Sequence, residues 1–311
     1  MNICPVCSYK LNDVTKKTSY PGIVTQDKKV LGFSEILFCS NCKLGIASPD
    51  IPEDALRNYY EKGGYWKQSN PGRAFRNAVV PYALAKSRWE DIENLLIKSK
   101  NCKDISILDI GAGHGFIGVI ANESSNISLK KYTYVEPDLR MRQCLDNYWL
   151  RRHDKYKLEM KKALNEVVGQ YNVIILSHVL EHIKDPLSML ESVTLFTISN
   201  SILLLDVPNQ DYIFKENVFP HILFFNQESL KHLINKAKSI DTVFISGYGK
   251  DMDKSPLNKK ISLLKIITCK IIWVLHHILP HKLLVKLYTA HLGIDHKNSN
   301  GTWIRALCRR R

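Results

Sequence analysis

The sequence lacks an acidic surplus, a signal-like start and internal repeats. Its 44 lysines and arginines outnumber 30 acidic residues, which leaves a formal net charge of +14. Such a surplus favours an anionic partner: a nucleic acid, an anionic membrane face or a phosphorylated substrate. The first residues hold no basic region followed by an apolar run, so we expect no secretory signal. No stretch recurs, so we do not expect a repeat architecture.

The chain also lacks an uncharged apolar run long enough to cross a membrane. The most apolar stretch, 261–279, contains Lys265, Lys270 and two histidines. A charge at the centre of a spanning helix costs about 2.5–3.5 kcal/mol, so a span is not expected. The basic insertion at about 256–292 instead predicts amphipathic helices that lie on an anionic membrane surface. Packing on the protein's own core or on a dimer partner is the alternative.

What is present is an ordinary globular composition. The 311 residues are 45% hydrophobic and 24% charged, which suits one large domain or two smaller ones. Four of the eight cysteines form two Cys-x-x-Cys pairs, Cys4 with Cys7 and Cys39 with Cys42. Two such turns can complete a closed tetrahedral site, so residues 1–48 predict a small zinc ribbon with a structural Zn²⁺. Two unrelated thiol pairs are the alternative.

A glycine-rich turn follows the apolar run that begins at Ile107. Asp109 is followed by Gly111, Gly113 and Gly115 at alternate positions, and a helix-compatible run begins at Phe116. This pattern is typical of a buried strand, a tight turn and a helix start. The glycines let a ligand approach the backbone, and the helix N-terminus suits a carboxylate or phosphate.

Polar residues end two later apolar strands as well. Glu136 ends the run 131–136, about twenty residues after the glycines, where an adenosine ribose is bound in such folds. Residues 171–177 form another strand pattern that ends in Ser177. Directly after it come His178, His182 and an Asp-Pro pair.

These three motifs resemble those of the class I S-adenosylmethionine-dependent methyltransferases, over roughly residues 105–250. The resemblance implies that S-adenosylmethionine is bound by Asp109, Gly111, Gly113, Gly115, Glu136 and Ser177. The N-terminal ribbon adds similarity to sugar and polysaccharide-biosynthesis methyltransferases. The segment 161–165 departs from the pattern, because it lacks the Asp that many relatives direct at the adenine. A Rossmann-like domain for another nucleotide is the alternative.

The predicted fold class is α/β: a Rossmann-like, mostly parallel seven-stranded sheet with helices on both faces, preceded by a small zinc ribbon. The predicted strands are 105–110, 131–136, 156–160, 171–177, 201–207, 242–247 and 303–309. We divide the chain into a ribbon (1–48), a helical lid or linker (49–100) and the methyltransferase domain (101–311).

The middle segment contains predicted helices at 53–60 and about 72–98, separated by a glycine-aromatic loop. In zinc-bearing members of the resembled family, a segment of this kind covers the cofactor. Tyr59, Tyr60, Tyr65 and Trp66 are therefore lid candidates, and Tyr65 is also a candidate cofactor contact. Interdomain packing is the alternative role.

Three histidines are candidates for the general base, because imidazole titrates near neutral pH. His178 ends the fourth strand, His182 follows one turn later, and His221 lies in the loop after the fifth strand. His182 and His221 resemble positions used as bases in zinc-bearing sugar C-methyltransferases. Pro220 replaces the Glu of that subgroup, and the chain stops at 311 without its additional C-terminal domain, so O-methylation fits better. Glu181 is expected to orient these groups, and backbone packing is the alternative role of His178.

The expected function is methyl transfer to a small-molecule or glycan acceptor, above all a sugar hydroxyl in nucleotide-linked or lipid-linked saccharide synthesis. The alternatives are an RNA methyltransferase and a non-catalytic cofactor-binding scaffold. Residues 1–50 are nearly neutral and the basic excess lies in 250–311, which favours a membrane or lipid-linked partner over nucleic acid. We expect a cytoplasmic protein, in peripheral contact with the inner membrane face if the insertion binds lipid. The oligomeric state stays open.

Overall fold

The computed structural model describes residues 3–17, 23–24, 30–32, 34–62, 78–150, 157–215, 218–252 and 279–311. Tyr65 and Trp66 lie outside these ranges, and so does the insertion from 253 to 278. The predictions for those residues therefore stay predictions.

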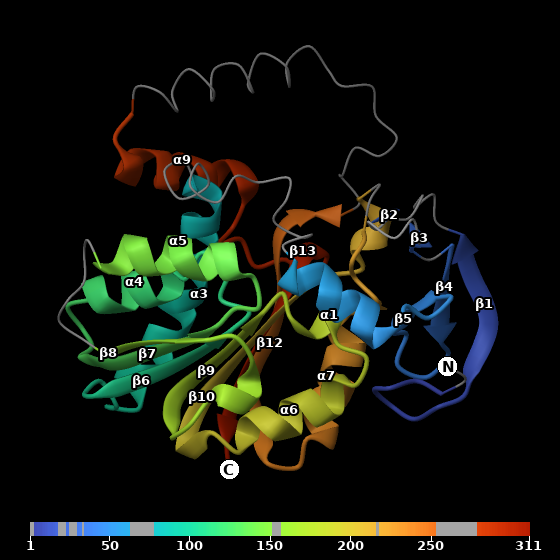
Figure 1. Cartoon of the computed structure of the whole chain (residues 1–311), viewed down its shortest axis with the longest axis horizontal. Coiled ribbons are helices and arrows are strands. Elements are labelled where there is room, and N and C mark those ends of the chain that lie inside the picture. Colours follow the sequence, from blue (N-terminus) through green and yellow to red (C-terminus); the bar gives the residue numbers. More distant parts are fainter. Residues whose placement is uncertain are drawn as a thin grey trace.

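A seven-stranded sheet in the order β12-β13-β10-β9-β6-β7-β8 forms the centre of the molecule (Figure 1). Strands β8, β7, β6, β9 and β10 pair in parallel, and β13 runs antiparallel to β10 and β12. The predicted Rossmann-like, mostly parallel sheet is confirmed. The strands are β6 (Ile105–Ile110), β7 (Leu129–Val135), β8 (Lys157–Lys161), β9 (Tyr171–Ser177), β10 (Thr197–Pro208), β12 (Ile240–Asp251) and β13 (Gly301–Arg310).

Several strands are longer than their apolar patterns predict. The pattern places the fifth strand at 201–207, whereas β10 begins at Thr197 and ends at Pro208. The pattern is shorter because polar residues that are exposed near the beginning of β10 carry no hydrophobic signal. Pairing with β13 runs from Ile202 opposite Arg309 to Pro208 opposite Trp303. Backbone hydrogen bonding therefore sets the extent of these strands.

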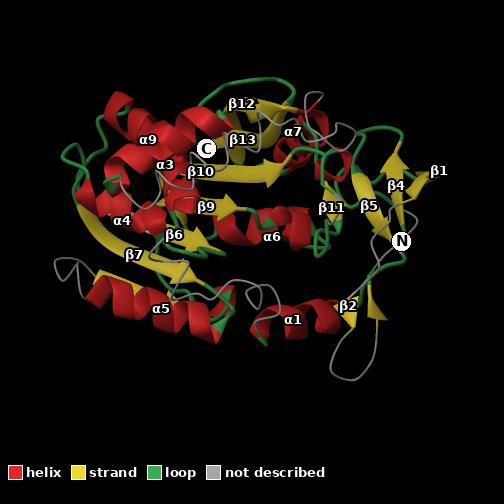
Figure 2. Ribbon diagram, turned by 90° about the horizontal axis from the view of Figure 1, so that it is seen from above, coloured by secondary structure: helices red, strands yellow, loops and turns green. Residues whose placement is uncertain are grey.

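Alternate residues of each strand enter different cores. Ile107 and Val173 pack in the core that contains Trp89, whereas Leu108 and Ile174 pack in the core on the other face. The first core lies under α3 (Val79–Lys98), α4 (Phe116–Glu123) and α5 (Leu139–Leu150), and the second under α6 (Pro186–Thr194) and α7 (Gln227–Lys236). Both faces of the sheet are covered (Figure 2), which explains the near-continuous apolar strands.

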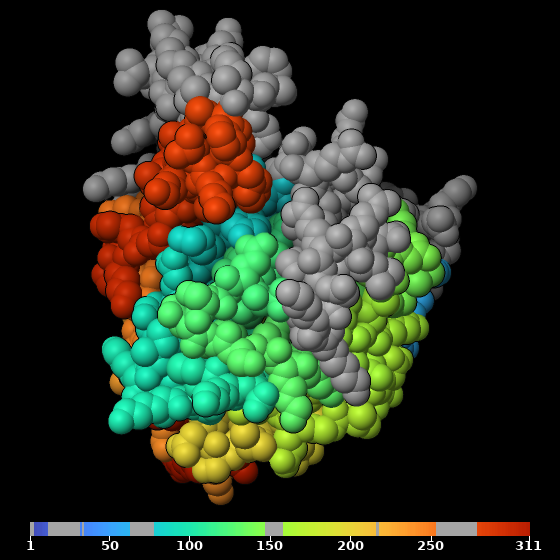
Figure 3. Space-filling model, turned by 90° about the vertical axis from the view of Figure 1, so that its left-hand side faces the viewer, coloured from blue at the N-terminus to red at the C-terminus, as the bar shows by residue number. Residues whose placement is uncertain are grey.

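The C-terminal part of the insertion packs on the protein itself. Helix α9 (His281–Leu292) buries Leu284 and Val285 against Val79 and Ala83 of α3. Figure 3 shows orange-red α9 beside cyan α3. For α9, packing on the protein's own core is therefore the observed arrangement. Among the residues that the structure describes, no helix is both long enough and apolar enough to cross a membrane.

The N-terminal segment forms a second sheet that the body completes. Strands β1 (Leu11–Lys17), β4 (Glu35–Cys39) and β5 (Gly45–Ser48) are followed in this sheet by β11 (Leu223–Phe224), which comes from the body (Figure 2). A small hairpin, β2 (Ile23–Val24) with β3 (Val30–Leu31), lies between β1 and β4 in the sequence. A Cβ on Gly45 would lie 3.0 Å from Cβ of Phe224, so only glycine allows this pairing without displacement.

Candidate active site

The glycine turn after β6 has the backbone conformation that the motif predicts. Gly111, Gly113 and Gly115 have φ angles of 67°, 54° and 61°, in the left-handed region that favours glycine. A Cβ on Gly111 would also lie 2.7 Å from Cγ2 of Val179. Helix α4 begins directly after the turn, at Phe116. Gly111 and Gly115 donate their N–H groups to the Val135 and Ala112 carbonyls, so the turn presents backbone without side chains at the carboxyl end of the sheet, where open α/β folds bind ligands.

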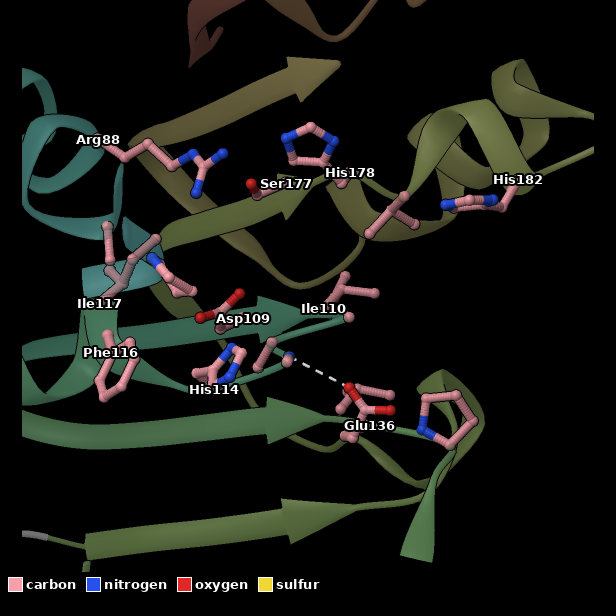
Figure 4. Close-up of a pocket in the computed structure, with 18 of the residues that line it drawn as sticks. Arg88, Asp109, Ile110, His114, Phe116, Ile117, Glu136, Ser177, His178 and His182 are labelled. Atoms are coloured by element: carbon pink, nitrogen blue, oxygen red, sulfur yellow. Dashed lines mark hydrogen bonds between the residues drawn. The ribbon is translucent and has the colours of Figure 1, made fainter. Parts of the chain in front are cut away.

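Glu136 reaches back to this turn from the end of β7. Its Oε2 accepts a hydrogen bond from the Gly113 N–H at 3.1 Å, and its Oε1 accepts one from the Asp138 N–H at 3.1 Å (Figure 4). Burial raises the pKa of Glu136 to about 7, although these two hydrogen bonds lower it. These two hydrogen bonds hold the Glu136 carboxylate in place at the cavity wall.

Asp109 lies at the centre of the same wall (Figure 4). Its Oδ2 accepts a hydrogen bond from the Tyr132 hydroxyl at 2.7 Å, and 2% of the residue is exposed. Burial raises the pKa of Asp109 to about 7, against the opposing effects of Tyr132 and Arg88. A buried carboxylate beside glycine N–H groups suits a ligand that carries both a cation and hydrogen-bonding groups.

Arg88 is a site residue that the sequence analysis missed. It extends from α3 to the cavity, and its Nε donates to Oδ2 of Asp206 at 2.7 Å. Burial raises the pKa of Asp206, but Arg88 and Arg305 outweigh this effect and hold it below its usual range. A single arginine in an amphipathic helix has no motif around it, so only the packing of α3 against β10 could identify it.

A cavity of about 560 Å³ opens between these elements. The glycine turn, Asp109, Glu136 and Ser177 form one part of its lining, and Arg88, Tyr60, His178 and His182 another. Leu164, Ile183 and Met189 add apolar surface, and Leu164 comes from the segment 161–165 that lacks the adenine-directed Asp. The cavity therefore combines the polar residues of all three sequence motifs in one place.

Two of the candidate histidines face this cavity. His178 has a left-handed φ of 56°, and its backbone N–H donates to the Asp206 carbonyl at 2.8 Å. Its Nδ1 lies 3.2 Å from Oε1 of Glu181. The Nδ1 of His182 lies 2.8 Å from the Tyr60 hydroxyl, and burial lowers the pKa of His182 to about 4.

His221 lies behind His182 and outside the cavity lining. The two rings meet edge to face with centroids 4.8 Å apart. Nδ1 of His221 is 2.8 Å from Oδ2 of Asp211, an ion-pair contact without the alignment of a linear hydrogen bond. Burial raises the pKa of Asp211, but His221 and Lys215 outweigh it and hold that pKa at about 2.

The helix α1 (Glu53–Glu61) brings two of the lid candidates to the histidines. Tyr60 hydrogen-bonds His182, and the Tyr59 ring packs edge to face on Phe219 with centroids 5.3 Å apart. Tyr60 therefore contributes to the cavity lining. Tyr59 instead packs against Phe219 of the body, which is an interdomain packing role.

The four cysteines of the N-terminal pairs converge. Cys4 Sγ lies 3.6 Å from Cys42 Sγ, and Cys7 Sγ lies 3.3 Å from Cys39 Sγ. All four sulfur atoms lie within 4.8 Å of one another. A tetrahedral site with Zn–S bonds of about 2.3 Å separates its sulfurs by about 3.8 Å, so the cluster has the dimensions for a zinc ion.

Comparisons with known proteins agree with this geometry. Residues 84–238 match the family model of a methyltransferase domain. Magnesium protoporphyrin IX methyltransferase from Synechocystis PCC 6803, solved with SAH, is similar in fold: TM-score 0.52, 9% identity, 84% of this chain and 100% of that one covered. The plantazolicin methyltransferase BamL, solved with a triazolic desmethylPZN analogue and SAH, has a TM-score of 0.50 and 10% identity, over 83% of this chain and 98% of that one.

No curated protein sequence matches this chain. The two solved structures share the fold at low identity, and the family match covers the cavity-forming elements from α3 to α7. Residues 84–238, just under half of the chain, thus match the methyltransferase-domain model, and the chain is an S-adenosylmethionine-dependent methyltransferase.

Proposed function

We propose that this protein methylates a hydroxyl group of a small-molecule acceptor, above all a sugar in nucleotide-linked or lipid-linked saccharide synthesis. The observation that carries the proposal is the single cavity in which Asp109 and the Gly113–Glu136 pair face His178 and His182. S-adenosylmethionine, when bound, supplies a methyl group on a positively charged sulfur. The resemblance to ribbon-bearing sugar methyltransferases supports the sugar acceptor.

The residues on the strand ends would hold the cofactor. Glu136 would accept hydrogen bonds from the ribose hydroxyls, because its carboxylate is already oriented by two N–H donors. Asp109 and Ser177 would bind the polar remainder, and the glycine turn, whose N–H groups already donate within the protein, would let the cofactor approach the backbone. Leu164, with the other apolar lining residues, would contact the adenine, which suits a segment without an acidic side chain.

The histidines would prepare the acceptor. A hydroxyl is a weak nucleophile until its proton is removed, and a positioned base contributes about 10²–10⁴ in rate. His178 and His182 line the cavity, and His221 supports His182 from behind. Glu181 would orient His178 through its 3.2 Å contact.

The N-terminal cysteines would bind a structural Zn²⁺, because four thiolates leave no position for a reactive water. Tyr65 stays a candidate cofactor contact. A lipid-linked acceptor would also agree with the predicted contact between the basic insertion and an anionic membrane, which concerns residues 253–278, beyond the described ranges.

We expect Glu136→Ala to lower S-adenosylmethionine affinity about ten- to a hundredfold. Losing a charged acceptor costs about 1.5–3 kcal/mol, and each 1.4 kcal/mol changes affinity about tenfold. Gly113→Val should also block binding, since Gly113 has a left-handed φ and approaches Glu136. Isothermal titration calorimetry measures both effects. Glu191→Ala, which changes an exposed carboxylate on α6, is the control. Unchanged affinity in both site variants would refute the cofactor site.

Cofactor affinity should also increase with pH. The pKa of Glu136 is raised to about 7 by burial, so at pH 6 most molecules carry a protonated Glu136 that has lost acceptor capacity. For a single group of this pKa, the ionised fraction rises about tenfold from pH 6 to pH 8, and affinity should rise with it. Burial also raises the pKa of Asp109 to about 7, so Asp109 adds to the increase over the same pH range. Glu136→Gln, which cannot ionise, should show a flatter profile in the same titrations. Equal slopes for both proteins would contradict the role of Glu136.

A further inference from the structure

Behind the cavity wall, a carboxylate is buried with an unsatisfied oxygen. Glu181 is 1% exposed, and its Oε2 has no hydrogen-bond partner among the residues that the structure describes. The ion-pair contacts found for it in the described ranges are with His178 and His182. A buried carboxylate with an unsatisfied oxygen is stabilised when a cation compensates it.

Two imidazoles beside Glu181 are arranged as metal ligands commonly are. A metal-bound histidine usually directs its other ring nitrogen at a carboxylate, a carbonyl or a water, which fixes the ring and its tautomer. Nδ1 of His221 lies 2.8 Å from Oδ2 of Asp211, a close contact without the alignment of a linear hydrogen bond. The Nδ1 of His182 lies 2.8 Å from the Tyr60 hydroxyl and 3.4 Å from the Pro220 carbonyl. His182 Nε2 is then on the side of Glu181, 3.8 Å from Oε1.

We propose that Glu181, His182 and His221 bind a divalent transition-metal ion, separate from the cysteine cluster. One ligand atom from each residue lies within 4.8 Å of those from the others. Neighbouring ligands at about 2.1 Å from a metal are about 3.0–3.4 Å apart, so the side chains would close by about 1–2 Å on binding. Two imidazoles and one carboxylate favour Zn²⁺, Co²⁺ or Fe²⁺ over Mg²⁺ or Ca²⁺.

This inference rests on the acceptor site proposed above, because the ion would lie behind the cavity wall that His182 forms. Nδ1 of His182 contacts Tyr60, a cavity residue, and Nε2 is on the side of Glu181, so the ion would be held on the side of the ring away from Tyr60. Bound there, it would fix the ring and the tautomer of His182. The acceptor hydroxyl proton would pass to His178, which faces the cavity and is not one of the three ligands.

Cobalt titration of the full chain, with Zn²⁺ already bound by the cysteines, tests the site. Wild-type protein should bind one further equivalent of Co²⁺, with d–d absorption but without the thiolate charge-transfer band of a cysteine site. Glu181→Gln, which keeps the side-chain shape, and His221→Ala should lose this equivalent. The exposed Glu191→Gln should retain it.

S-adenosylmethionine binding, measured on each variant, shows that the body is folded and tests the proposed function separately. A Glu181→Gln protein that binds the cofactor normally but not the additional Co²⁺ would support the metal site. The proposal is overturned if zinc-loaded wild-type protein takes up no further Co²⁺, or if Glu181→Gln binds as much as Glu191→Gln. Neither result depends on finding the acceptor.

Discussion

Cys39→Ser is expected to unfold the N-terminal module and to release its metal. Cys4, Cys39 and Cys42 are at most 1% exposed, and the module is too small to bury a large core without them. Structural zinc binding supplies about 10–16 kcal/mol in small domains of this type, so losing one thiolate should remove most of the module's stability. The cysteines of the wild-type chain should hold one zinc per molecule, and the variant should contain about one zinc fewer than the wild type.

Cys102→Ser and Cys144→Ser are matched controls, because both cysteines are half-buried and outside the cluster. Elemental analysis of protein purified without added zinc gives the metal content. Hydrogen exchange across residues 35–48 then reports folding of the module. Fully folded wild-type protein with less than half an equivalent of zinc would contradict the prediction.

The effect should extend into the active site. Strand β5 pairs with β11, the Ala47 N–H donates to the Ile222 carbonyl at 2.9 Å, and the Ile222 N–H donates to the Glu181 carbonyl at 2.8 Å. Loss of the module therefore frees the loop that carries His221. The proposed cofactor residues Asp109 and Glu136 lie on β6 and directly after β7, so kcat should fall further than S-adenosylmethionine affinity. Equal losses of both would show that the whole body has unfolded.

His182→Ala is expected to lower kcat by about 10²–10⁴ with a suitable acceptor, the usual effect of losing a group that assists proton transfer. His182 lines the cavity and contacts Tyr60, whereas the carboxylates proposed to bind the cofactor, Asp109 and Glu136, should stay in place. Cofactor affinity should therefore remain near normal. A methyl-transfer screen against nucleotide sugars, lipid-linked glycans and ribosomal RNA identifies the acceptor for this measurement.

His221→Ala should also reduce kcat, because His221 packs against His182 and contacts Asp211. His232→Ala is the control: this histidine is on α7 and does not line the cavity. If both His182→Ala and His221→Ala keep full kcat, the acceptor is activated elsewhere or needs no activation. Cobalt titration of the same variants separates loss of a base from loss of a metal ligand.

The sequence by itself determined the local features of the methyltransferase body. The alternation of Ile107 and Leu108 between two cores and the glycine turn after β6 are short-range patterns, since strand period and left-handed φ depend on neighbouring residues. Glu136 could be placed because its distance from the glycines along the chain follows from one strand-helix-strand unit.

Contacts between distant segments were decided only by the tertiary structure. Arg88 meets Asp206 across 118 positions, and Tyr60 meets His182 across 122. Strand β11 is two residues long, which is too short for a periodic pattern, so its pairing in the N-terminal sheet could not be predicted from the sequence. The cluster of Glu181, His182 and His221 also depends on Asp211, which lies in a short helical turn and contacts His221. Such pairs form where elements distant in the sequence pack together, so no local sequence pattern predicts them.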